Sequence, residues 1–306
     1  MFRFSDYLRI CRENRAITQT ELVDELLALD DTFQALDVTT LSRWERGVSK
    51  PALGKQTLMI QYFSRHFGRV YPFLEEAEPI TIEKSFCALG FSKLLGRHKM
   101  VMEFPTRLMD IQQFSIQFYA ESVHKSNALR KNYLILRELY GATFSETLHQ
   151  ELAENPQNYF AICDYQGDYF GHFFALKLKP DTFNRLMDFS LSVDQIQLND
   201  VCGPQELGCY YYFGFFSIGE LVISLIWIHF YTLLIKEQNH IQQLGAMIVS
   251  KEGETIAKNM NTQVLHSRQV NGQTISNFQA TPAQMLITEN VVKMLFNPES
   301  CPENRT

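Results

Sequence analysis

Within residues 1–70, hydrophobic positions recur every three or four residues, the spacing that places side chains on one face of a helix. One such run consists of Leu22, Val23, Leu26 and Leu27. Thr18 and Glu21 precede it at the spacing of a capping box, in which each side chain accepts a hydrogen bond from the other residue's backbone N–H. Further apolar runs start near Phe4 and Leu53. The pattern predicts a small all-α domain over residues 1–70.

Residues 37–50 predict a short helix with a polar outer face. Asp37 is a favoured helix cap, and Gly47 is a favoured stop. Leu41 and Trp44 lie three residues apart and therefore share the buried face. A helix with small polar side chains at its start and basic ones at its end can read base edges and bind phosphates.

Together with the helix before it, this segment resembles the phage-repressor (XRE-type) helix-turn-helix family. That family has a Gln at the start of its second helix and ends its third with a motif like Ser42–Gly47. The resemblance implies that three side chains face the bases, namely Val38, Thr39 and Arg43. It also implies contacts to the DNA backbone from Gln19, Thr40, Arg46, Ser49 and Lys50. Its partner would be a double-stranded DNA operator.

The connection between the two helices is longer than the family's tight turn. Residues 28–36 are the extra material, and they either lengthen the second helix or form a loop that packs Phe33 and Leu36 on the core. Residues 1–70 contain ten Lys and Arg against nine Asp and Glu, and the whole chain has a net charge of −6. To bind DNA, a domain with so little net charge must have its basic residues on one face and must gain contacts by dimerising. The alternative is a small helical domain whose Arg residues serve solubility alone.

The rest of the 306 residues is enough for a second domain. With 45% hydrophobic residues and 24 Phe, the whole chain can bury a large core. The six Cys are scattered, without a CxxC pair or a zinc-like spacing with His. Together with the lack of a signal segment, this predicts free thiols, no metal site and a cytoplasmic protein.

The second domain shows alternating strand and helix signals. The expected elements are a mainly helical stretch at 111–152, a hairpin of strands at 159–164 and 169–178, a strand at 209–216, a helix at 221–235, a strand at 243–249, a helix at 254–265 and a strand at 273–280. An acidic, proline-bounded passage at 71–79 indicates a boundary. We therefore expect a linker or docking segment at 71–100, an α/β domain at 101–290 and a tail at 291–306.

The apolar run Leu221–Ile235 could also suggest a membrane span. A span needs about 20 apolar residues, and this run is shorter and is followed by charged and polar residues. A helix that is apolar all round is typical of the centre of a large domain. We therefore expect a buried helix and no membrane partner.

The order of these elements, over roughly residues 100–285, resembles the GNAT (N-acetyltransferase-like) fold. The resemblance implies a mixed α/β sheet. In that family a loop of the form Gln/Arg-x-x-Gly-x-Gly/Ala precedes the central helix and binds the pyrophosphate of acetyl-CoA. The corresponding residues here, Phe215–Leu221, contain one glycine and no preceding basic residue, and Glu220 adds negative charge. We therefore expect no cofactor.

The sequence favours a non-catalytic second domain. His172, His229 and His266 are candidate acid–base residues, with Tyr210–Tyr212 as proton donors, but they form no recognisable constellation, and no catalytic residue is assigned. Aromatic residues next to the apolar helix could instead line a pocket for a partly apolar ligand. The candidate pocket residues are Tyr210, Tyr212, Phe215, Ser217 and Trp227.

These patterns together predict a dimeric, sequence-specific DNA-binding transcription regulator, whose second domain senses a ligand, mediates dimerisation, or both. Two other classes of function remain open. An active acyltransferase fused to a DNA-binding head would bind acetyl-CoA saturably and respond to substitution of Glu220. A constitutive DNA-binding scaffold would use its second domain only to oligomerise, and an open cavity lined by Tyr212, Phe215 and Trp227 would count against it.

Overall fold

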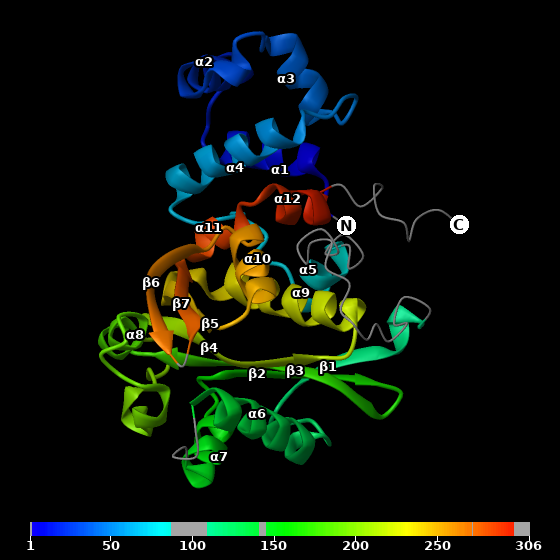
Figure 1. Ribbon diagram of the computed structural model, residues 1–306. Coiled ribbons are helices and arrows are strands. Elements are labelled where there is room, and N and C mark those ends of the chain that lie inside the picture. The colour runs from blue at the N-terminus through cyan, green and yellow to red at the C-terminus, as the bar shows by residue number, and fades with distance from the viewer. Residues whose placement is uncertain (1, 87–108, 141–144, 271, 297–306) are drawn as a thin grey trace. The chain divides into compact units, whose positions relative to one another are not determined.

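The computed structural model describes residues 2–86, 109–140, 145–270 and 272–296. The chain divides into two compact units. Unit 1 comprises Met1–Phe91 and Leu286–Thr306, and unit 2 comprises Ser92–Met285 (Figure 1). The structure is mixed α/β, as the sequence predicted, with helices in unit 1 and helices around a sheet in unit 2.

The described part of unit 1 is all helical. Its helices are α1 (Phe4–Asn14), α2 (Gln19–Leu29), α3 (Val38–Glu45), α4 (Leu53–Phe67), α5 (Pro79–Ser85) and α12 (Glu289–Phe296). The capping box of Thr18 and Glu21 is confirmed, and the Asp37 carboxylate accepts the backbone N–H of Thr40 at 2.6 Å. Gly47 follows α3 with a φ of 69°, a conformation that suits glycine best. Local sequence signals therefore set where α2 and α3 begin and where α3 ends.

The extra residues between α2 and α3 both lengthen α2 and form a loop that packs on the core, the two possibilities that the sequence left open. Helix α2 extends to Leu29, and a single 3₁₀ turn follows at Asp31–Phe33. Phe33 is fully buried and Leu36 nearly so. The longer connection therefore adds two apolar side chains to the core of unit 1.

The expected tail at 291–306 is wrong for its first six residues, which lie in helix α12. Five of them are buried, namely Val291, Val292, Met294, Leu295 and Phe296. The Phe296 ring lies 5.3 to 5.8 Å, centroid to centroid, from the rings of Phe4, Tyr7 and Tyr71. Residues 297–306 lie outside the described residues. A helix of eight residues has little stability alone, so this contact with distant parts of the sequence is what makes it a helix.

The structure also differs in part from the linker predicted at 71–100. Val70, Tyr71 and Leu74 are buried, and the Tyr71 hydroxyl donates to the backbone carbonyl of Leu286 at 2.7 Å. Helix α5 contributes the buried Ile82. Residues 71–86 therefore complete the core of unit 1, while residues 87–108 lie outside the described residues.

Unit 2 is built on a seven-stranded sheet in the order β1-β2-β3-β4-β5-β7-β6. The strands are β1 (Phe114–Phe118), β2 (Tyr159–Tyr165), β3 (Asp168–Leu178), β4 (Gly208–Ser217), β5 (Ile241–Ile248), β6 (Gln263–Val270) and β7 (Gln273–Ala280). Neighbouring strands are antiparallel except β4 and β5, which are parallel. The helix α9 (Glu220–Glu237) connects these two strands.

Helices cover both faces of this sheet (Figure 1). On one face lie α6 (Lys125–Tyr140) and α7 (Glu146–Glu154), and on the other lies α9. The remaining helices of the unit are α8 (Pro180–Met187) and α10 (Lys251–Asn259), and α11 (Pro282–Leu286) leads back to unit 1. Consecutive residues of β3 show the two faces: Phe173 packs on Trp227 of α9, and Phe174 packs on Phe213 and on His149 of α7.

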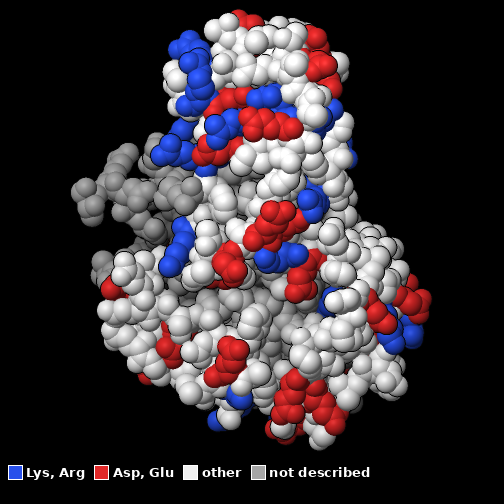
Figure 2. Space-filling view, turned by 180° about the vertical axis from the view of Figure 1, so that it is seen from behind, with Lys and Arg blue, Asp and Glu red and all other residues white. Residues whose placement is uncertain are grey.

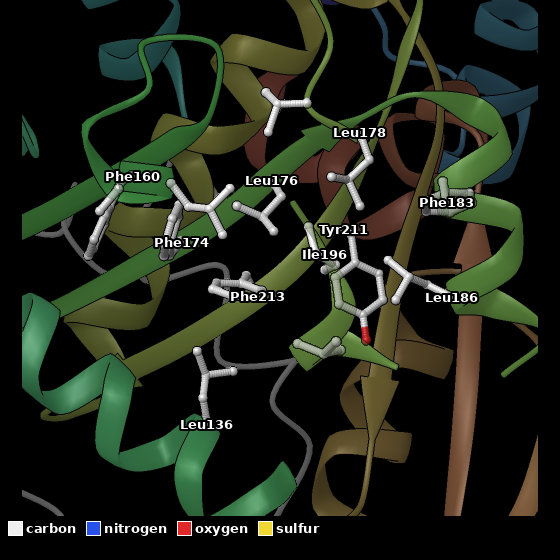
Figure 3. Close-up of a cluster of buried hydrophobic side chains, with 14 of the residues drawn as sticks. Leu136, Phe160, Phe174, Leu176, Leu178, Phe183, Leu186, Ile196, Tyr211 and Phe213 are labelled. Carbon is white, nitrogen blue, oxygen red and sulfur yellow. The ribbon is translucent and has the colours of Figure 1, made fainter. Parts of the chain in front are cut away.

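The core under α6 and α7 is rich in aromatic rings (Figure 3). Phe160 and Phe174 stack with centroids 4.3 Å apart, and Phe213 meets Phe174 edge-on at 5.2 Å. Because rings of this size each bury a large apolar area, this cluster contributes strongly to the stability of unit 2.

Most strand and helix predictions for unit 2 are confirmed, and two are wrong. The hairpin, β4, α9, β5 and β7 lie where the pattern placed them, within a few residues. Residues 114–118, expected in a helical stretch, form β1 because they pair with β2. The helix expected at 254–265 ends at Asn259, and Gln263–Val270 form β6. Strand β6 is exposed on both faces, so its sequence lacks the alternation that marks a half-buried strand.

Helix α9 is buried along its length, as expected. Among the described residues, no helix combines the length and apolar character that a membrane crossing requires.

Removing the Phe296 ring should destabilise unit 1. Phe296→Ala is expected to lower the free energy of unfolding by about 3–5 kcal/mol, because a buried ring is lost among three others. The measurement is urea unfolding, and Glu289→Gln, an exposed position on the same helix, is the control. Equal stability of the two variants would show that α12 is dispensable.

Candidate DNA-binding surface and ligand cavity

Helix α3 turns three predicted base-facing residues to the solvent. Val38, Thr39 and Arg43 are exposed, whereas Leu41 and Trp44 are buried on the opposite side. Thr39 and Arg43 are four residues apart, and therefore lie on one face of the helix. Among the described residues, no hydrogen bond or ion pair of the Arg43 side chain is found. The outer face of α3 is thus available to another molecule.

The predicted backbone-contacting residues surround this face, with one exception. Arg46 and Lys50 are exposed, and Thr40 and Ser49 are half-buried. The Arg46 Nε donates to the Ser42 carbonyl at 3.2 Å, which holds its side chain along α3. The backbone N–H groups of Val48 and Ser49 donate to the Arg43 carbonyl, so the loop after α3 folds back on the helix.

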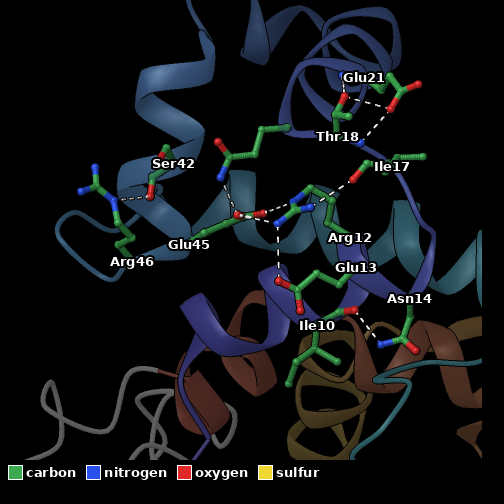
Figure 4. Close-up of polar contacts among 11 residues, drawn as sticks. Ile10, Arg12, Glu13, Asn14, Ile17, Thr18, Glu21, Ser42, Glu45 and Arg46 are labelled. Carbon is green, nitrogen blue, oxygen red and sulfur yellow. Dashed lines mark hydrogen bonds and ion pairs between the residues drawn. The ribbon is translucent and has the colours of Figure 1, made fainter.

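Gln19 is the exception, because its side chain binds inside unit 1. Its Nε2 donates to Glu45 Oε2 at 2.7 Å. Arg12 binds the same carboxylate through Nε at 2.6 Å and Nη2 at 3.1 Å, and its Nη1 donates to the Ile17 carbonyl (Figure 4). These residues come from α1, the start of α2 and the end of α3. We call Arg12, Gln19 and Glu45 the polar clamp.

The polar clamp joins three helices through one buried carboxylate. The Glu45 side chain is 4% exposed and that of Arg12 is 15% exposed, so the pair is shielded from water. The hydrogen bonds to Glu45 raise the pKa of Arg12 above its ordinary value. Glu45 was not predicted as a functional residue, although its position four residues after Leu41 puts it on the buried face of α3.

Several exposed basic side chains of unit 1 lie on α3 and its following loop, and others, such as Arg9 and Arg65, lie on α1 and α4. Figure 2 shows blue side chains on the flank of this unit where α3 lies, and red ones on the opposite flank. The exposed basic residues of α3 and its following loop are Arg43, Arg46 and Lys50. A near-neutral unit therefore still offers a small positive patch at α3.

Unit 2 contains a cavity of about 370 Å³ between β4, β5, α9 and α10. Of the five predicted pocket residues, Tyr212, Phe215 and Trp227 line it. Tyr210 and Ser217 do not: Tyr210 packs against Phe230, and the Ser217 hydroxyl donates to the Gly219 carbonyl at 3.0 Å. Strand alternation does not explain why Tyr210 is absent from the lining, since it shares a face of β4 with Tyr212. Tyr210 lies two residues further from the point where β4 and β5 part.

The cavity lies where β4 and β5 part. Their parallel pairing ends at Tyr212↔Ala246, although β4 continues to Ser217 and β5 to Ile248. Tyr212 packs on Trp227 of α9 at 5.6 Å, and Phe213 packs on Phe174 on the other face of the sheet. Both Tyr212 and Phe213 line the cavity, so it reaches both faces through the gap between the strands.

The hydroxyl side chains that line the cavity already have partners. The Tyr212 hydroxyl contacts Met285 Sδ at 3.4 Å, and burial raises the pKa of Tyr212 well above its ordinary value. Thr262 donates to the Ala257 carbonyl, and the Ser250 hydroxyl accepts from the Gly253 N–H. The described lining contains no Asp, Glu, His, Lys or Arg. A general acid or base is therefore not among these residues.

The candidate histidines lie away from the cavity lining. His172 and His149 both bind the Asn132 side chain inside the core, at 3.3 and 2.9 Å, and Tyr169 hydrogen-bonds to His172. Gly214 makes room for Asn132, since a Cβ there would lie 1.4 Å from its Oδ1. His229 binds the Tyr159 hydroxyl at 2.7 Å, and His266 is exposed on β6. His172, His149 and His229 thus have packing roles.

The loop that the GNAT resemblance placed at Phe215–Leu221 is short. Phe215–Ser217 belong to β4, and α9 begins at Glu220. Only Ile218 and Gly219 connect them, with Gly219 at a φ of 94°. Within the described part of the chain, no group of His, Cys, Asp and Glu is arranged to hold a metal ion.

Loss of the Glu45 charge should loosen unit 1. Glu45→Gln is expected to cost about 1–3 kcal/mol of unfolding free energy, because the partly buried Arg12 loses its counter-charge. The control is Arg9→Ala on α1, whose exposed pair with Asp6 should contribute less than about 1 kcal/mol. Both are measured by chemical denaturation, and a larger effect of Arg9→Ala would contradict the polar clamp.

Acid should destabilise unit 2 through its buried histidines. Burial lowers the pKa of His149 to about 4 and that of His172 to about 3, both from 6.5. Below pH 6.5 the two histidines bind protons in the unfolded chain but stay neutral in the folded unit. The free energy of unfolding is therefore not reduced above pH 6.5 and falls as the pH is lowered toward 4. Denaturation at pH 7.5, 6 and 5 measures it. His149→Gln should flatten the pH dependence.

No protein-family model matches the chain, and a search of curated proteins also finds no match.

Proposed function

We propose that this protein is a dimeric, sequence-specific DNA-binding transcription regulator whose second unit is a non-catalytic ligand sensor, a dimerisation module, or both. The observation that carries the proposal is the exposed face of α3, which presents Val38, Thr39 and Arg43 to the solvent. An α-helix fits the major groove of DNA, where side chains can read base edges directly.

The local architecture supports a reading helix. Helix α2 starts with the capping box at Thr18, and the polar clamp ties α3 to α1 and α2. A recognition helix must be held rigidly, because base contacts depend on hydrogen-bond geometry. The N–H groups at the start of α2 and the basic residues Arg46 and Lys50 would contact the DNA backbone. Gln19 would contribute mainly through the polar clamp.

Dimerisation follows from the small size of this surface. Three exposed basic residues, Arg43, Arg46 and Lys50, neutralise few phosphates. Two copies on a two-fold symmetric operator would double the contacts and make affinity depend on half-site spacing. Affinity should also fall steeply with salt, since each phosphate contact releases counterions.

The cavity of unit 2 supports sensing over catalysis or scaffolding. A purely oligomerising domain needs a filled core, and here an opening of about 370 Å³ is lined by Tyr212, Phe215 and Trp227. A ligand that prefers one arrangement of the dimer would shift operator affinity by its differential binding free energy. The lack of acid or base groups in the described lining gives no support to a transferase.

Substitution of Arg43 should test the DNA-binding surface. Arg43→Ala is expected to weaken binding to the operator by about 1–3 kcal/mol and to relax preference at one base pair, as expected for a lost base contact. Genome-wide footprinting identifies the operator, and titration of the duplex measures the loss. Arg130→Ala, an exposed arginine on α6, is the matched control.

The pattern of loss distinguishes the outcomes. Equal weakening on all DNA sequences would make Arg43 a phosphate contact and leave specificity to other residues. Footprints that survive Arg43→Ala combined with Thr39→Ala, or that are absent from the native protein, would overturn the proposed function.

A further inference from the structure

The cavity of unit 2 combines three properties that restrict its occupant. It is surrounded by apolar side chains, its described lining carries no charged side chain, and two strand edges border it. Its volume of about 370 Å³ lies within the range of small-molecule sites, roughly 300–1,000 Å³. This inference rests on the proposed function and names the chemistry of the sensed molecule.

The apolar character of the walls comes from both faces of the sheet. The rings of Tyr212, Phe215 and Trp227 lie on the α9 side, and Phe213 lies on the α6 side. Met247 and Met260 add flexible side chains that can adjust to the shape of an occupant. Most of the occupant's surface must therefore be hydrocarbon or aromatic.

The absence of charge from the described lining disfavours burial of an ionic group in the cavity. Transfer of a carboxylate, phosphate or ammonium group into an apolar site without a counter-charge is strongly unfavourable. Tyr212, Ser250 and Thr262, the hydroxyl side chains of the lining, are neutral and already engaged. A charged ligand would lose its hydration and gain no ion pair.

The strand edges supply the hydrogen bonds that the side chains do not. Gly214 and Phe215 of β4, and Ile248 of β5, line the cavity beyond the last β4–β5 pair. On their other sides, β4 pairs with β3 and β5 pairs with β7. Since peptide groups of a strand point alternately to either side, some of those beyond Tyr212 and Ala246 face the gap. A group with both a donor and an acceptor, such as an amide, would satisfy them.

We infer that the cavity binds a neutral, largely apolar small molecule that carries one uncharged donor–acceptor group of the amide type, bound between the parted edges of β4 and β5. Nucleotide thioesters and free fatty acids should bind more weakly, because the described lining offers their charged groups no ion pair. The neutral group fixes the ligand's orientation, and the aromatic walls supply most of the binding free energy.

Four probes that share an eight-carbon chain test this chemistry on the full-length protein. N-methyloctanamide, octanoate, octylamine and octanoyl-CoA are titrated by calorimetry at pH 7.5. We expect saturable binding of N-methyloctanamide at one site per chain, and at least about tenfold weaker binding of the three charged probes. Octanoate or octanoyl-CoA that binds as tightly as the amide would overturn the inference, as would no saturable binding of the amide.

Two substitutions that fill the cavity locate the site. Ala257→Leu on α10 and Ala246→Leu on β5 should each weaken amide binding at least about tenfold, because they take up space that the ligand needs. Asn127→Leu adds the same side chain at an exposed position of α6 and should leave binding unchanged. Amide binding that survives both filling substitutions would place the ligand elsewhere and overturn the inference.

Operator binding, measured with and without N-methyloctanamide, separates this inference from the proposed function. Specific DNA binding without any amide binding would overturn the ligand class and leave the DNA-binding function standing. Amide binding that Ala257→Leu abolishes, in a protein that binds no operator, would support the ligand class and overturn the proposed function.

Discussion

The parallel pairing of β4 with β5 is the constraint on which unit 2 depends. It joins an antiparallel half-sheet of β1–β4 to a second one of β5, β7 and β6, and it extends over only part of both strands. A parallel pair needs a crossover connection, which α9 supplies over its 18 residues. Because α9 is buried along its length, apolar packing largely sets its position, and the hydrogen bond of His229 to Tyr159 of β2 adds to it.

The same pairing creates the cavity. Were β4 and β5 paired to their ends, their peptide groups would be satisfied and the space between Tyr212, Phe215 and Trp227 would close. Sheets usually pair wherever they can, since buried peptide groups without partners are costly. The inferred ligand would bind where these strands part, next to Gly214, where Asn132 packs directly on the β4 backbone.

Unit 1 depends on a comparable contact between distant residues, in this case a polar one. The polar clamp brings Arg12, Gln19 and Glu45 together across three helices, and α12 closes the apolar core from the far end of the chain. The clamp fixes α3 from its buried side, so its outer face is left to the solvent. A recognition helix must be both rigid and exposed. In the eight residues of α3, the buried side holds the helix in place and the opposite side is exposed.

Local patterns by themselves determined much of this protein. The caps of α2 and α3, the exposed face of α3, the β2–β3 hairpin and the buried α9 follow from residues close together in the sequence. Tertiary structure alone decided β1, β6 and α12, because their state depends on distant partners, and it placed Gln19 on Glu45 rather than on the surface. The tertiary structure also decided that Tyr212, and not Tyr210, lines the cavity. Both residues lie on the same face of β4 and pair with β5, but Tyr212 is the last to do so, and no local pattern encodes where two strands part.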